Sequence, residues 1–372
     1  MQFINLQAQY QLISESVKKR IENVLNHGQY ILGPEVTELE NKLATYAGTR
    51  FCVSTGSGTV SLEMALRALS IGPGDEVITV PYSFFATAEV IAIVGAKPVF
   101  VDIRPDTFCI NEDLIEQAVT SRTKAIIPVS LYGQMPDMEK INAIAAKHGL
   151  AVIEDAAQSF GAEQRTADGK QLHSCGASLI GSTSFYPAKP LGGYGEGGAL
   201  FTNDEALYKK FIMLRNHGSP KRDERLMLGM NARLDSIQAA ILDAKLPHLN
   251  EYIAARQRAA AYYDKAFAGC EQILVPAHQQ HSTHVFHQYT LRVVGADRDK
   301  LREGLAEAGI PAMIYYPVPL HQQKAYRDPR YQDGDFPVAE KLAACVLSLP
   351  MHTELDEEQL AYITGSVLEL IR

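Results

Sequence analysis

The feature that most constrains the fold is the alternation of short apolar, β-branched runs with helical segments between residues 51 and 202. Several of these runs are continuously apolar, which is typical of strands covered by helices on both faces. Between them, Leu62, Leu66 and Leu69 recur at helical spacing, as do Met138 and Ile141. The pattern predicts an α/β fold around a mainly parallel, seven-stranded sheet. The runs expected to form its strands are residues 51–54, 76–80, 98–101, 125–129, 151–154, 182–186 and 198–202.

The rest of the chain predicts a second, smaller unit. An alanine-rich, charged segment between Leu234 and Ala268, interrupted only by Pro247, predicts one or two connecting helices. Beyond it, strand-like runs at 287–293 and 312–316 and two helical stretches predict a small α+β unit. Because 372 residues exceed the usual size of one domain, we expect a large domain at residues 1–245 and a small C-terminal domain at 246–372.

Charge and cysteine usage narrow the class of partner. The formal net charge is −8, and no long basic run offers the electrostatic footprint that nucleic acid or an anionic membrane requires. A small-molecule partner is therefore favoured, with no nucleic acid and no membrane. The five cysteines are scattered without a C-x-x-C pair, which favours reduced thiols. Since the sequence has neither a signal-peptide pattern nor a membrane-length apolar run, we expect a cytoplasmic protein.

The most informative segment for chemistry is SFYPAKPLGGYGEGG at residues 184–198, between two predicted strands. Pro187 and Pro190 keep Lys189 out of a helix interior, and the glycines let the backbone approach another group closely. A lone lysine in a turn is most often solvated. In this context, we predict a buried lysine whose charged form is disfavoured by desolvation, as an amine that forms a Schiff base requires.

Two further segments complete a candidate site. The apolar strand at 151–154 leads into Asp155, where an α/β sheet opens onto its crevice. Asp155 alone is also compatible with a helix cap. Beside a Schiff-base lysine, however, a carboxylate can keep a pyridinium nitrogen protonated, and Gln158 can hydrogen-bond the ring's oxygen substituent. The glycine-rich turn at residues 54–59, with the Thr59 hydroxyl before a helix, is a weak indication of a phosphate site.

Other nucleotide and metal motifs fit less well. A dinucleotide fingerprint starting at Gly56 fails because Ser61 stands where its third glycine belongs, and no Gly-Lys-Ser/Thr phosphate loop is present. The glycines at residues 193–198 precede a predicted strand and not the helix that the fingerprint requires. A zinc site is an alternative for the histidines at positions 278, 281, 284 and 287. Without a partnering cysteine or carboxylate cluster nearby, we predict no metal.

Six motifs in order resemble the DegT/DnrJ/EryC1/StrS family of sugar aminotransferases, and the likeness extends over nearly the whole chain. They are GSGT at 56–59, SFFAT at 83–87, PVSLYGQ at 128–134, EDAAQ at 154–158, SFYPAK at 184–189 and NARLD at 231–235. The resemblance implies a fold-type I enzyme, similar to aspartate aminotransferase, that depends on pyridoxal 5'-phosphate. It also implies a homodimer with shared active sites.

The resemblance assigns roles to individual residues. It implies that Lys189 bonds covalently to the cofactor and moves protons during catalysis. It further implies that Asp155 binds the pyridine nitrogen and Gln158 the phenolic oxygen. Phe84 matches the family's ring-stacking position. The residues implied to hold the phosphate are Gly58, Thr59, Ser184 and, from the neighbouring subunit, Asn231.

The phrases at residues 27–40, 128–134 and 189–192 look most like aminotransferases for UDP-2-acetamido-2-deoxy-3-ketoglucuronate. This likeness implies amination at C3 with L-glutamate as donor and a role in polysaccharide biosynthesis, such as that of lipopolysaccharide O-antigen. Arg233 suits the C6 carboxylate of such a sugar, and Tyr315 is a second candidate for substrate contact. Amination of a dTDP- or UDP-linked keto-6-deoxyhexose at C3 or C4 is the alternative. A more distant alternative is a regulator that binds pyridoxal phosphate without turnover.

Overall fold

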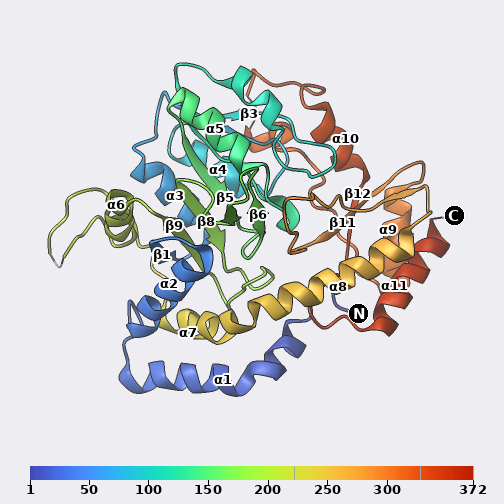
Figure 1. Cartoon of the computed structure of the whole chain (residues 1–372), viewed down its shortest axis with the longest axis horizontal. Helices are drawn as coiled ribbons and strands as arrows, with labels where there is room; N and C mark the ends of the chain where they lie inside the picture. The colour runs from blue at the N-terminus through green and yellow to red at the C-terminus, as the bar shows by residue number, and fades with distance from the viewer. Residues whose placement is uncertain (222, 327, 372) are drawn as a thin grey trace.

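The computed structural model describes residues 1–221, 223–326 and 328–371, and its centre is the predicted seven-stranded sheet (Figure 1). Only β9 runs antiparallel to its neighbours β1 and β8, and the other pairings are parallel. The mainly parallel α/β sheet is therefore confirmed. In spatial order, its strands are β1 Phe51–Thr55, β9 Gly198–Thr202, β8 Ile180–Ser184, β5 Ala151–Asp155, β4 Thr123–Ile126, β2 Glu76–Thr79 and β3 Lys97–Phe100.

Some strand limits differ from the prediction. β8 ends at Ser184, not at residue 186, because Ser184 makes the last pair with Gly198 before the chain turns tightly. Residues 312–316 form no strand, and only Met313 makes an isolated bridge, to Ser348. The C-terminal sheet is instead antiparallel and contains β10 Ile273–Leu274, β11 Tyr289–Val293 and β12 Val346–Leu349. A separate hairpin pairs β6 Glu163–Arg165 with β7 Gln171–His173.

Helices cover both faces of the large sheet, which explains why its strands are apolar on both sides. One core contains Leu62 and Phe211, and the other contains Leu39, Ile141 and Leu242. The helices of the first face are α3 Gly58–Ala68, α4 Ala86–Ile93 and α6 Glu205–Arg215. Those of the second are α2 Pro34–Ala47, α5 Met138–His148 and α7 Ser236–Lys245, with α1 Leu6–His27 packed on α7.

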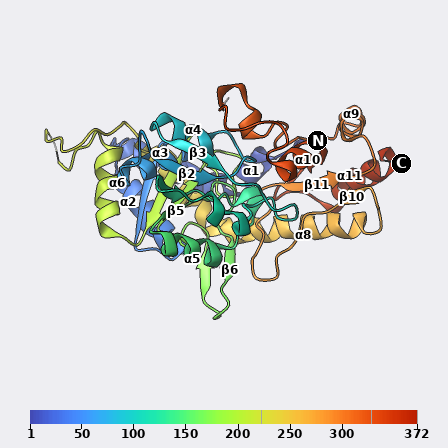
Figure 2. The ribbon, with the colours of Figure 1, turned by 90° about the horizontal axis from the view of Figure 1, so that it is seen from above.

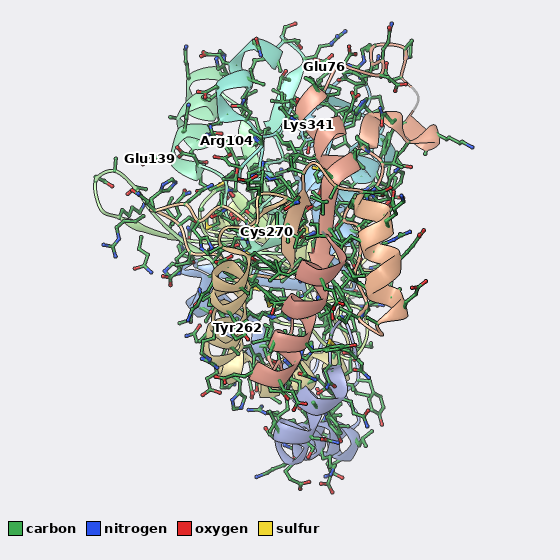
Figure 3. The ribbon with its side chains drawn as sticks, turned by 90° about the vertical axis from the view of Figure 1, so that its right-hand side faces the viewer. Glu76, Arg104, Glu139, Tyr262, Cys270 and Lys341 are labelled. Carbon is green, nitrogen blue, oxygen red and sulfur yellow. The ribbon has the colours of Figure 1, made fainter. Side chains whose placement is uncertain are left out.

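The alanine-rich segment forms α7, a short 3-10 turn at Leu246–His248 that contains Pro247, and α8 Leu249–Phe267. α7 and α8 follow one another along one side of the molecule and lead to the small sheet (Figures 1 and 2). Figure 3 views this part from the side and labels Tyr262 on α8, Cys270 in the turn after it and Lys341 on α10. Its other helices are α9 Arg298–Glu307, α10 Pro337–Cys345 and α11 Glu357–Leu370. None of the described helices is long and apolar enough to cross a membrane.

The remaining helical pieces are single 3-10 turns. They are Glu112–Leu114, Glu116–Ala118, Leu131–Gly133, Leu320–Gln322 and Lys324–Tyr326.

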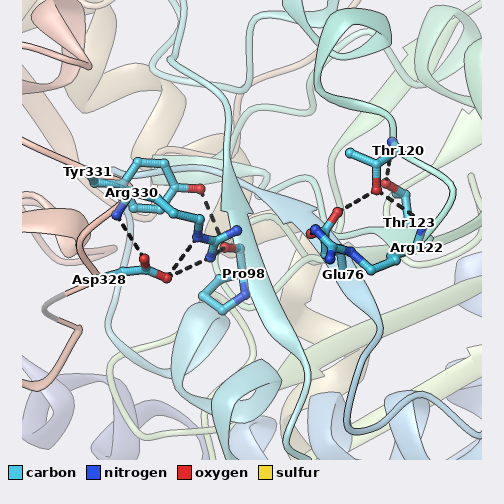
Figure 4. Close-up of polar contacts among 8 residues, drawn as sticks. All are labelled: Glu76, Pro98, Thr120, Arg122, Thr123, Asp328, Arg330 and Tyr331. Carbon is cyan, nitrogen blue, oxygen red and sulfur yellow. Dashed lines mark hydrogen bonds and ion pairs between the residues drawn. The ribbon is translucent and has the colours of Figure 1, made fainter.

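The C-terminal part also returns to the large sheet and protects its edge strand β3 (Figure 4). The backbone N–H of Phe100 donates to the Tyr331 hydroxyl at 3.0 Å, and the Arg330 guanidinium donates to the Pro98 carbonyl at 3.1 Å. Asp328 holds Arg330 at 2.7 Å. These side chains occupy backbone groups that an edge strand would otherwise offer to another chain.

Replacing Tyr331 with phenylalanine should therefore destabilise the protein while keeping the ring in place. The Phe100 N–H would lose its partner, and we expect the free energy of unfolding to fall by about 1–2 kcal/mol. Urea denaturation followed by circular dichroism measures this change. The control is Tyr362→Phe, which removes an exposed hydroxyl that donates to the Ala308 carbonyl at 2.9 Å. Because water can replace this bond, stability should change by less than about 0.5 kcal/mol. Equal losses for the two variants would contradict the role given to Tyr331.

Candidate active site

A cavity of about 490 Å³ lies where the parallel strands end, as expected for an α/β sheet. Asp155 reaches it from the end of β5, and Lys189 from the loop after β8. The other predicted residues that line it are Gly58, Thr59, Phe84, Gln158, Ser184 and Tyr315. Eight residues proposed from five distant segments of the sequence thus share one cavity.

Asp155 is a buried carboxylate with a fixed orientation. Only 6% of the residue is exposed, and its Oδ2 accepts a hydrogen bond from Thr87 Oγ1 at 2.7 Å. Its Oδ1 accepts from the Ala157 N–H at 3.2 Å. Burial raises the pKa of Asp155, whereas these two donors and the positive charge of Lys189 act in the opposite direction. The carboxylate is therefore placed to bind a group that carries a proton or a positive charge.

Lys189 lies on a compact loop. Its backbone N–H donates to the Tyr186 carbonyl at 2.9 Å, and the Tyr186 N–H donates to Ser184 Oγ at 3.2 Å. Gly192 allows this turn, because a Cβ there would stand 2.3 Å from the Pro187 carbonyl oxygen. Burial lowers the pKa of the Lys189 amine to about 8, although Asp155 opposes the shift. More of this amine is thus neutral, and therefore nucleophilic, near neutral pH than of an ordinary exposed lysine.

The start of α3 forms a cradle for an anion. Ser57 is the N-cap, with its Oγ accepting from the Val60 N–H at 3.2 Å, so that Gly58 and Thr59 form the first turn beside the cavity. A Cβ on Gly58 would lie 2.8 Å from the Ser184 Cβ, so a side chain at this position would close the gap. Free N–H groups of a first helical turn, together with the hydroxyls of Thr59 and Ser184, suit a phosphate group.

Gln158 and Phe84 occupy two further sides of the cavity. Gln158 Oε1 accepts from the Tyr132 N–H at 2.8 Å, and its Nε2 donates to the Tyr316 hydroxyl at 3.1 Å. Phe84 is 57% exposed, and its ring centroid is 6.2 Å from that of Tyr316. The exposed Phe84 ring can stack on a planar group.

Asn231 and Arg233 do not line this cavity. Asn231 is exposed, and the Arg233 guanidinium donates to Asn216 Oδ1 at 2.7 Å. Arg233 therefore lies outside the cavity of its own chain. A contribution of Asn231 to a neighbouring subunit stays a prediction.

Three of the four histidines that suggested a zinc site have other neighbours in the fold, and His278 and His284 both pack against Phe286. His278 pairs with Asp264 at 2.9 Å, and His284 stacks on the Phe286 ring with centroids 3.9 Å apart. Within the described parts of the chain, no group of three metal-ligating side chains comes together. His287 lines the cavity, where burial and the nearby charge of Lys189 lower its pKa well below the usual value.

Sequence reasoning missed several residues of the site. Thr87 ends the motif at residues 83–87, and Tyr316 follows the predicted contact residue Tyr315, but their partners, Asp155 and Gln158, are distant in sequence. His287 belonged to the histidine run that suggested a metal, so its position beside Lys189 had no sequence signal. Glu196 and Gln288 also line the cavity.

Comparison with known proteins identifies relatives that match nearly the whole chain. Residues 11–368 match the model of the DegT/DnrJ/EryC1/StrS aminotransferase family. The chain is 46% identical to a UDP-2-acetamido-2-deoxy-3-oxo-D-glucuronate aminotransferase of Pseudomonas aeruginosa, over 99% of both chains. It is 45% identical to a pleiotropic regulatory protein of Geobacillus stearothermophilus, over 99% of this chain and 98% of the relative.

A UDP-N-acetyl-3-dehydro-α-D-glucosamine 3-aminotransferase of Acidithiobacillus ferrooxidans is 44% identical, over 97% of this chain and 95% of the relative. Among solved structures, a DegT/DnrJ/EryC1/StrS aminotransferase from Brucella abortus superimposes with a TM-score of 0.94 at 40% identity, covering 100% of this chain and 99% of that one. These matches extend over nearly the whole chain and include the segments that carry Lys189 and Asp155. The chain therefore belongs to the DegT/DnrJ/EryC1/StrS aminotransferase family.

Proposed function

We propose that this protein uses pyridoxal 5'-phosphate to transfer the amino group of L-glutamate to a nucleotide-linked keto sugar. The substrate we favour is UDP-2-acetamido-2-deoxy-3-ketoglucuronate, aminated at C3. The observation that carries the proposal is the single cavity that holds the Lys189 amine, the Asp155 carboxylate and a phosphate cradle at the start of α3.

The residues present fit each part of this cofactor. Gly58, Thr59 and Ser184 suit its phosphate, and Phe84 suits the face of its ring. Asp155 suits the ring nitrogen, because a buried carboxylate favours a protonated partner. When bound, pyridoxal phosphate supplies an electron sink for the carbon that gains or loses the amino group.

The chain's own groups then have defined tasks. Asp155, oriented by Thr87, holds a proton on the ring nitrogen. Lys189 would hold the cofactor through its neutral amine and, when that amine is free, would move a proton at the substrate carbon. The lowered pKa of Lys189 keeps this amine available near neutral pH.

The names of the relatives support C3 as the position aminated. The relatives from Pseudomonas aeruginosa and Acidithiobacillus ferrooxidans are both named for sugars with a ketone at C3, one of them a uronate and the other not. A uronate carboxylate requires a cationic partner, and Arg233 is our candidate. A dTDP- or UDP-linked keto-6-deoxyhexose is the alternative substrate, and Tyr315 lines the cavity in either case.

We further propose that two copies of the chain form a homodimer that completes each site. The phosphates and carboxylates of the ligands require positive charge, yet Lys189 is the only lysine or arginine among the described residues that line the cavity. Asn231 and Arg233 lie outside their own cavity, beside a segment that exposes Leu226 by 63% and Leu228 by 93%. Exposed apolar side chains of this kind are typical of protein interfaces.

The family resemblance also suggests where the enzyme works and what its product is used for. We propose a cytoplasmic enzyme whose aminated sugar serves polysaccharide biosynthesis, such as that of lipopolysaccharide O-antigen. We also propose that its two domains divide after Lys245, where α7 ends.

Lys189→Ala should abolish transamination and the visible absorbance of the lysine-attached cofactor. A methyl group offers no amine for attachment or proton transfer, and we expect kcat to fall by at least about 1000-fold. A coupled assay of 2-oxoglutarate release measures turnover. Lys209→Ala, which removes an exposed lysine paired with Glu205, should retain full activity. Wild-type turnover by the Lys189 variant would reject the assignment.

Mixing two inactive variants tests whether the site is shared. Lys189→Ala and Asn231→Ala chains should each be impaired alone, but a mixed dimer contains one intact site. Random exchange of subunits should restore about a quarter of wild-type activity, since half of the dimers are mixed and each has one working site. No recovery after verified subunit exchange would contradict a role for Asn231 across the interface.

Arg233→Ala separates the two substrate classes. If Arg233 of one copy binds the sugar carboxylate in the other, kcat/KM for the keto uronate should fall roughly 10- to 100-fold. The value for an uncharged UDP-3-keto sugar should change little. Arg225→Ala, in the same segment, is the matched control. Equal losses on both sugars would argue against the uronate.

A further inference from the structure

The amide of Gln158 has a defined orientation inside the cavity. The backbone N–H of Tyr132 can only donate, so the atom 2.8 Å from it is Oε1. Nε2 therefore lies on the other side, where it donates to the Tyr316 hydroxyl at 3.1 Å. An amide nitrogen carries two protons, and Tyr316 accepts only one of them. The second N–H of Gln158 is thus available to a ligand.

The first partner of this amide is held firmly. Tyr132 has a φ of +58°, a left-handed conformation that is unfavourable for a bulky residue. The C-terminal part fixes this turn through two backbone bonds, from Val285 N–H to the Gly133 carbonyl at 2.9 Å and from Gln288 N–H to the Tyr132 carbonyl at 3.3 Å. The strained backbone directs its N–H to Gln158.

The second partner is held by a buried tyrosine. The Tyr316 backbone N–H donates to the Tyr82 hydroxyl at 2.8 Å, and that hydroxyl donates to the Tyr315 carbonyl at 2.9 Å. Tyr82 itself is completely buried. Burial also raises the pKa of Tyr316, so its hydroxyl stays neutral. The oxygen that accepts from Gln158 thus has a fixed position.

We propose that Tyr316 is a positioning residue that, with the Tyr132 N–H, fixes the Gln158 amide so that its free N–H meets an anionic oxygen on the ring of the bound cofactor. The inference rests on the proposed function, because it takes pyridoxal phosphate as the ligand. Tyr316 acts through Gln158. Its effect should therefore disappear when Gln158 is absent.

A double-mutant cycle on cofactor binding tests this dependence. The dissociation constant of pyridoxal phosphate is measured without substrate, by absorbance titration of the wild type, Tyr316→Phe, Gln158→Ala and the double variant. We expect Tyr316→Phe to weaken binding about fivefold, as for one neutral hydrogen bond, and to move the absorbance maximum of the bound cofactor. In the Gln158→Ala background, the same change should have no further effect.

Tyr326→Phe is the matched control, because its hydroxyl is buried without a hydrogen-bond partner among the described residues. It should leave the dissociation constant and the absorbance maximum unchanged. If Tyr316→Phe weakens binding equally with and without Gln158, or does not weaken it in the wild type, the positioning role is overturned while the proposed function stands. If the wild-type chain shows no saturable binding of pyridoxal phosphate, the proposed function and this inference both fail.

Discussion

The buried pairing of a carboxylate and an amine in one cavity is the constraint on which the site depends. Removal from water disfavours the charged form of both groups, raising the pKa of Asp155 and lowering that of Lys189. Each also stabilises the other's charge through the cavity. The balance leaves an acidic group that can hold a ring proton and an amine that can lose its own. An exposed pair would have ordinary pKa values and neither property.

The pairing of two neighbouring strands brings these two groups to the same edge of the sheet. β5 and β8 are parallel neighbours in which Asp155 pairs with Ser182, so the loop after β8 starts beside the end of β5. The loop turns tightly at Gly192, and Lys189 on this loop lines the same cavity as Asp155. The α/β sheet itself was predictable from the sequence, because strands buried on both faces require continuous apolar runs.

Other parts were not predictable because their partners are distant in the sequence. The run at 312–316 has strand-like composition, yet the Tyr315 carbonyl accepts hydrogen bonds from Tyr82 and Tyr132, which lie in the segments that follow β2 and β4. β12 takes the place beside β11. Thr87 is an ordinary threonine until the fold places it 2.7 Å from Asp155. Local pattern thus gave the strands and the principal acid and amine. The side chains that orient them depend on tertiary contacts.

The C-terminal part completes the cavity with groups that add no positive charge. Tyr316 stays neutral because burial raises its pKa, and His287 stays neutral because burial and the charges of Lys189 and Arg256 lower its pKa. A ligand with phosphate and carboxylate groups therefore meets helix N–H groups and hydroxyls from this chain, with Lys189 as its one lysine or arginine in the described lining. In the proposed homodimer, Arg233 of the second copy would add a positive charge to this ligand, because its guanidinium lies outside the cavity of its own chain.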